Sequence, residues 1–130
     1  MSEARELLAT RADVWAFFEE PNHLTDWWPG ILGVVPDRRG FAPGARWTVE
    51  IRTQNIFTGR GVKESLLLVD AVEPYERWAW RVLAGKLAVE LRLQARADHT
   101  LVTCTASGRG ARPDLALKRL YDLLQTAATL

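Results

Sequence analysis

The sequence has little cysteine, little charge imbalance and no long apolar run. Cys104 is the single cysteine, so no intramolecular disulfide can form, which favours a reducing compartment. Seventeen Lys and Arg oppose sixteen Asp and Glu, and this net charge of +1 argues against nucleic acid and stable membrane association as partners. No apolar run approaches the ~20 residues of a membrane-spanning helix, and the first residues lack a signal-peptide pattern. We therefore expect a cytoplasmic monomer or homodimer.

The motifs of common catalytic and cofactor sites are also missing. There is no Gly-x-Ser-x-Gly elbow, no Walker loop and no dinucleotide-binding glycine pattern. His23 and Asp26 stand three residues apart and would share one face of a helix, but two ligands do not make a metal site. No second histidine cluster or cysteine pair completes them. We predict no metal and no cofactor.

What the sequence does contain is enough apolar material for one packed domain, residues 1–130. Hydrophobic residues make up 48% of the chain, and six of them are tryptophans. Near the N-terminus, Thr10 is a helix cap and Pro21 ends that first helix. Asn22 is expected to cap a second short helix, which Pro29 and Gly30 end.

The middle of the chain alternates apolar and polar residues, which is typical of strands. The expected strands are around Arg5 to Ala9, Ile31 to Val35, Trp47 to Ile51, Val62 to Val72, Trp78 to Val82, Leu87 to Leu93 and Leu101 to Ser107. A long amphipathic helix begins at Pro113. These elements predict an α+β fold in which a six- or seven-stranded antiparallel meander curls around the C-terminal helix.

Four short motifs, in this order, resemble those of a known superfamily: Ala12-Asp13-Val14-Trp15, Asp26-Trp27-Trp28-Pro29-Gly30, Pro43-Gly44-Ala45-Arg46-Trp47 and Val72-Glu73-Pro74-Tyr75-Glu76-Arg77-Trp78-Ala79-Trp80. The chain resembles the START-like (SRPBCC) helix-grip superfamily, in particular its polyketide cyclase/dehydrase and lipid-transport branch. In that family a curved sheet and a long helix enclose an apolar cavity. The resemblance implies a pocket for a small molecule without naming the occupant.

A small apolar ligand, aromatic, polyketide-like or lipid-like, is therefore the predicted partner, held by a carrier, sensor or storage protein. Each tryptophan also has the alternative role of packing in the core. The predicted ligand-contacting residues are Trp27, Trp28, Trp47, Val49, Ile51, Trp78, Trp80, Val89, Leu91, Leu117, Leu120, Tyr121 and Leu124. Ile56 and Phe57 are apolar residues in a loop, where they form either an entrance gate or a self-packed turn.

Two other functions remain open. An enzyme, a cyclase or dehydratase, would need a group that moves a proton, and the candidates are Glu64, Asp26 and His23. Glu64 points into the cavity if it shares the inward face of Leu66 and Leu68, and otherwise turns to water. A second alternative is an interaction module that resembles chaperone activators. The segment Gly108-Arg-Gly110 before the last helix either holds an anion or forms a solvated loop.

Overall fold

The computed structural model describes residues 1–55, 57 and 59–128. Its elements are β1 (Ser2–Leu7), α1 (Arg11–Glu19), η1 (Pro21–His23), α2 (Leu24–Trp27), β2 (Ile31–Val35), β3 (Arg46–Asn55), β4 (Gly59–Glu73), β5 (Arg77–Val82), η2 (Ala84–Lys86), β6 (Leu87–Arg96), β7 (His99–Ser107) and α3 (Pro113–Ala128). The predicted α+β class and helix-grip fold are confirmed.

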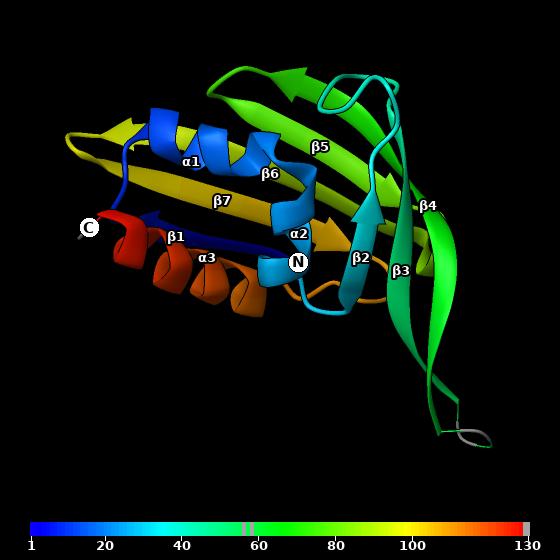
Figure 1. Cartoon of the computed structure of the whole chain (residues 1–130). Coiled ribbons are helices and arrows are strands. Elements are labelled where there is room, and N and C mark those ends of the chain that lie inside the picture. Colours follow the sequence, from blue (N-terminus) through cyan, green and yellow to red (C-terminus); the bar gives the residue numbers. More distant parts are fainter. Residues whose placement is uncertain (56, 58, 129–130) are drawn as a thin grey trace.

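The strands form one curved antiparallel sheet of seven strands in the order β1-β7-β6-β5-β4-β3-β2. Strands β2 to β7 follow one another as a meander, as the alternating sequence predicts. Strand β1 closes the sheet at the far side by pairing with β7 from Ser2 opposite Thr105 to Leu7 opposite Thr100. Figure 1 shows the three helices lying over one face of the sheet, with α3 beside β1 and β7.

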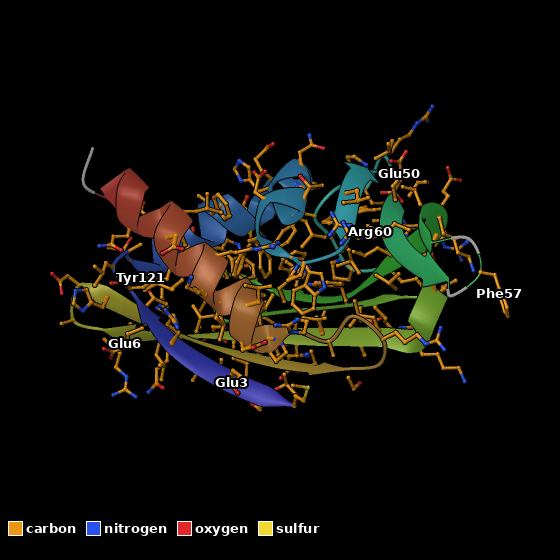
Figure 2. The ribbon with its side chains drawn as sticks, turned by 90° about the horizontal axis from the view of Figure 1, so that it is seen from below. Glu3, Glu6, Glu50, Phe57, Arg60 and Tyr121 are labelled. Atoms are coloured by element: carbon orange, nitrogen blue, oxygen red, sulfur yellow. The ribbon has the colours of Figure 1, made fainter. Side chains whose placement is uncertain are left out.

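The predicted bounds of the first strand are wrong. The strand covers Ser2–Leu7, whereas the apolar residues around Arg5 to Ala9 placed it later. Five of its six residues are exposed and only Leu7 is buried, so the strand shows no alternation of apolar and polar residues. Glu3 and Glu6, on opposite faces of this edge strand, are both exposed (Figure 2). Pairing with β7, and not burial, defines the strand, and single-sequence periodicity does not detect pairing.

The two short helices arise largely as the sequence indicates. Thr10 Oγ accepts a hydrogen bond from the Asp13 backbone N–H at 3.2 Å, which caps α1. The predicted cap at Asn22 is wrong, because Asn22 lies inside the 3-10 turn η1 and its carbonyl instead accepts a hydrogen bond from Thr25. After α2, Trp28 leaves the helical conformation before Pro29, and Gly30 turns the chain at φ +90°.

Helix α3 begins at Pro113, as predicted, and presents one apolar stripe to the sheet. Ala116, Leu117, Leu120 and Leu124 are buried, and Tyr121 is half-buried under Arg5, whose guanidinium carbon lies 5.5 Å from the ring centre. None of the described helices is both long enough and apolar enough to cross a membrane.

Candidate functional site

A cluster of aromatic rings fills the space between the short helices and the middle of the sheet. Trp78 of β5 lies at its centre, with ring centroids between 5.1 and 6.3 Å from those of the rings around it. Those neighbours are Phe18, Trp27, Phe41, Trp47 and Trp80. Each of the five tryptophans from Trp27 to Trp80 is at most 1% exposed. These rings occupy the interior by packing on one another.

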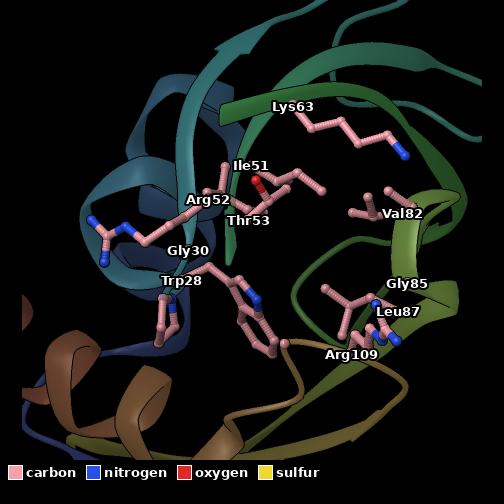
Figure 3. Close-up of a pocket in the computed structure, with 14 residues that line it drawn as sticks. Trp28, Gly30, Ile51, Arg52, Thr53, Lys63, Val82, Gly85, Leu87 and Arg109 are labelled. Carbon is pink, nitrogen blue, oxygen red and sulfur yellow. The ribbon is translucent and has the colours of Figure 1, made fainter. Parts of the chain in front are cut away.

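One hollow of the molecule lies at an end of this cluster, beyond Trp28. A cavity of about 370 Å³ opens there between β3, β4, the η2 turn and the loop that precedes α3. We call it the end pocket. Its lining residues are Trp28, Pro29, Gly30, Ile31, Ile51, Arg52, Thr53, Lys63, Val82, Ala84, Gly85, Leu87, Arg109 and Gly110 (Figure 3).

The local sequence explains why these segments meet at the pocket. The turn after Trp28 is tied to β3 because the Arg52 N–H donates to the Gly30 carbonyl at 2.8 Å. On the opposite side, the η2 turn is tied to β4 because Ser65 Oγ accepts a hydrogen bond from the Ala84 N–H at 3.0 Å. One anchor joins two backbones and the other uses the Ser65 hydroxyl, and both attach the pocket walls to strands of the sheet.

The η2 turn and the loop before α3 also lie directly against each other. The Arg109 N–H donates to the Gly85 carbonyl at 2.9 Å. A Cβ at Gly108 would overlap the backbone of Lys86, and Gly108 has φ +93°, so only glycine suits this position. The contact fixes the backbone that carries Arg109 at the pocket.

The lining is apolar on its walls and cationic at its rim. Ile31, Val82 and Leu87 are buried, and Ile51 and Ala84 are half-buried. Lys63 and Arg109 are exposed, and among the lining residues there is no Asp, Glu or His. Figure 3 shows the Arg52 side chain directed away from the cavity, so Arg52 contributes its backbone to the wall.

The predicted ligand-contacting residues divide into three groups. Trp28 and Ile51 line the end pocket. Trp80 and Val89 border a shallower hollow over β5, β6 and β7. The others lie in the aromatic cluster or under the helices and do not belong to the end-pocket lining: Trp27, Trp47, Val49, Trp78, Leu91, Leu117, Leu120, Tyr121 and Leu124.

The predicted gate and the predicted acid/base groups also lie away from the end pocket. Phe57 is 89% exposed at the tip of the β3–β4 hairpin (Figure 2), and Ile56 lies outside the described residues. His23 Nδ1–H donates a hydrogen bond to the Phe17 carbonyl oxygen of α1 at 2.9 Å, and the His23 ring stacks on the Phe17 ring with centroids 4.2 Å apart. Asp26 is exposed.

Of the two placements open for Glu64, the structure has the outward one. Trp47 opposite Leu67 and Val49 opposite Ser65 define the inward face of β3 and β4, which leaves Glu64 exposed on the outer face opposite Glu50. Among residues 1–55, 57 and 59–128, no group of three or more His, Cys, Asp or Glu is placed to hold a metal.

Sequence reasoning did not identify Thr53, Lys63, Val82, Ala84 and Leu87 as pocket residues. Thr53 and Lys63 could have been identified from the strand alternation. Thr53 stands two residues after Ile51 and Lys63 two residues before Ser65, so both side chains lie on the inward face, toward the open end of the hairpin. Arg109 did appear in the sequence analysis as part of a possible anion-binding loop. The structure places it at the pocket and pairs the neighbouring Arg112 with Asp114 at 3.4 Å.

Comparisons with known proteins agree with this architecture. A family model described as polyketide cyclase / dehydrase and lipid transport matches residues 1–127. No curated protein matches the sequence.

Several solved structures share the fold at low sequence identity. Protein DR_A0006 from Deinococcus radiodurans is 19% identical, with a TM-score of 0.75 over 100% of this chain and 98% of that chain. Protein NE0264 from Nitrosomonas europaea is 18% identical, with a TM-score of 0.72 over 100% and 96% of the two chains. Protein CV1439 from Chromobacterium violaceum is 17% identical, with a TM-score of 0.68 over 96% of each chain.

Proposed function

The chain belongs to the polyketide cyclase/dehydrase and lipid transport family, and we propose that it binds one small, largely apolar molecule in the end pocket. The observation that carries the proposal is the cavity of about 370 Å³ with apolar walls. Ligand pockets range from about 300 to 1,000 Å³, so this one suits a compact molecule better than a long lipid. Burial of apolar surface against Ile51, Val82 and Leu87 supplies the binding free energy.

A binding role, as carrier, sensor or storage protein, is better supported than turnover. A cyclase or dehydratase needs an acid or base within hydrogen-bond reach of its substrate. The described lining of the end pocket offers no carboxylate and no imidazole, and His23, Asp26 and Glu64 lie elsewhere. A bound molecule should therefore be recovered chemically unchanged.

The test uses a neutral apolar probe, N-phenylnaphthylamine, whose emission rises in a dry site. The unmodified protein should bind the probe, and its melting temperature should rise as probe is added. At a probe concentration a hundredfold above Kd, binding should add about 2.7 kcal/mol to the free energy of unfolding. Thr53→Trp fills the cavity from the β3 wall and should abolish both effects. Its matched control is Thr48→Trp, a half-buried threonine of the same strand on the outer face.

The control variant should bind the probe like the unmodified protein. Equal binding by Thr53→Trp would place the probe outside the end pocket. A folded protein that takes up no probe at all would contradict the proposal. If native mass spectrometry of incubated protein detects a dehydrated or cyclised product of a polyketide-like compound, the enzyme alternative replaces the binding role.

A further inference from the structure

Hydrogen-bond donors outnumber acceptors among the side chains of the end pocket. Lys63 and Arg109 carry only N–H donors, and the Trp28 indole adds another. The Thr53 hydroxyl is the one lining side chain that can accept. A ligand that complements this set must present acceptors, and two positive charges at the rim favour a negative one.

Lys63 reaches the pocket because of its register in the sheet. It stands opposite Ile51 in the β3–β4 pairing, on the same face as Ser65 and Leu67. A lysine at this position breaks the apolar alternation of the inward face at the point where the pocket opens. The ion pairs found among the described residues involve Arg77, Arg81, Arg92, Arg112 and His99, and none of them engages Lys63.

Arg109 reaches the same cavity from a different part of the chain. The Arg109 backbone is fixed by its hydrogen bond to the Gly85 carbonyl. A Cβ atom on residue 85 would lie 2.7 Å from the Arg109 Cβ, so the glycine at position 85 leaves the space that the Arg109 side chain occupies. Within the described part of the chain, no carboxylate lies within 4.0 Å of its guanidinium nitrogens. Figure 3 shows Lys63 at the upper edge of the cavity, above Val82, and Arg109 at the lower edge, beside Gly85 and Leu87.

The third donor is buried. Trp28 is 1% exposed, and its Nε1 has no hydrogen-bond partner among the described residues. Figure 3 shows the nitrogen-bearing edge of this indole turned toward the cavity. The indole N–H groups of Trp78 and Trp80, outside the pocket lining, are also buried without a partner among the described residues, so the Trp28 N–H does not by itself select a ligand.

From the apolar walls and the two cations at the rim we infer that the end pocket takes an apolar acid, a compact aromatic or aliphatic body that carries one carboxylate. The body packs against the apolar walls, and the positive charges of Lys63 and Arg109 at the rim attract the carboxylate. This inference rests on the proposed function, since it assigns a chemical class to the molecule that the pocket binds.

The test compares two probes of the same shape, naphthoate and naphthamide, which differ in charge. Isothermal titration of the unmodified protein should give naphthoate a Kd about tenfold lower, because charge-assisted hydrogen bonds are stronger than neutral ones. Lys63→Gln and Arg109→Gln should each reduce this preference, and the double variant should remove most of it, with naphthamide binding unchanged in all three. Added salt should weaken naphthoate binding only, because the cations are exposed.

Arg60→Gln is the matched control. Arg60 is an exposed cation of the same strand as Lys63 and lies outside the lining, so its removal should leave the preference for naphthoate intact. Equal affinity for both probes in the unmodified protein would overturn the inference while the proposed function stands. Failure to bind either probe, together with failure to bind N-phenylnaphthylamine, would overturn both.

Discussion

Trp78 is the residue on which the interior depends most. It is 1% exposed and lies between rings contributed by α1, α2, the loop after β2, β3 and its own strand. Because rings surround it on several sides, the neighbours cannot collapse easily into the space that a small residue would leave. Trp78 therefore contributes strongly to the stability of the fold, although it does not line the end pocket.

We predict that Trp78→Ala lowers the free energy of unfolding by about 3 to 5 kcal/mol, as truncation of buried aromatic residues does. Trp78→Phe should cost clearly less, because it keeps a ring and removes an indole N–H that has no partner among the described residues. Urea unfolding of both variants measures the difference. Similar losses for the two variants, or a loss below that of an exposed-site substitution, would show that the cluster is not tightly packed.

Cys104 gives a second prediction at the residue scale. It lies buried in β7, and burial raises the pKa of its thiol from 9.0 to about 12. The unfolded chain loses this proton near pH 9 and the folded protein near pH 12, so the thiol stabilises the fold below pH 9 and this contribution is lost as the pH rises toward 12.

The measurement is urea unfolding of the unmodified protein and of Cys104→Ala between pH 8 and pH 11. The free energy of unfolding should fall more steeply with pH in the unmodified protein, since both proteins share every other group that titrates in this range. In the same way, the native thiol should not react with a disulfide reagent at pH 8. Parallel pH profiles would contradict the assignment.

At the scale of elements, strands could be predicted from the sequence where apolar and polar residues alternate, because the alternation shows which face of the strand is buried. The strands around Trp47, Trp78 and Leu87 alternate apolar and polar residues, and the structure buries the apolar set. The run from Leu66 to Val69 has no alternation, so its facing could not be predicted from the sequence. Cross-strand pairing with Trp47 turns Leu67 inward and leaves Leu66 exposed.

The candidate site was predicted less well than the fold, and the reason is also physical. Buried aromatic residues look the same in a sequence whether they line a cavity or fill it. The end pocket forms where the β3–β4 hairpin, the η2 turn and the Gly108 loop meet, and the approach of these segments depends on long-range register and on Gly85 and Gly108. No local pattern encodes that meeting.

At the scale of the whole molecule, the two ends of the sequence hold each other in place. Strand β1 pairs with β7 along its full length, and the Met1 amino group donates to the Ala106 carbonyl at 3.0 Å. Helix α3 in turn lies against β1 and β7. Removal of β1 would expose one side of α3 and leave β7 as an unprotected sheet edge.

We therefore predict that deletion of residues 1–7 abolishes cooperative thermal unfolding, although the deleted segment contains one buried side chain, Leu7. Most of the loss comes from backbone pairing and from the cover that β1 gives to α3, so side-chain substitutions on its outer face should have little effect. The matched control is Glu6→Gln, an exposed position of β1 that lies opposite Leu101, on the face away from Leu7. Circular dichroism melts of the two proteins distinguish a role of backbone pairing from a role of charge on β1. A truncated chain that still melts sharply would show that β1 is dispensable. A control that loses its transition would show that charge on this strand, and not pairing, holds the two ends together.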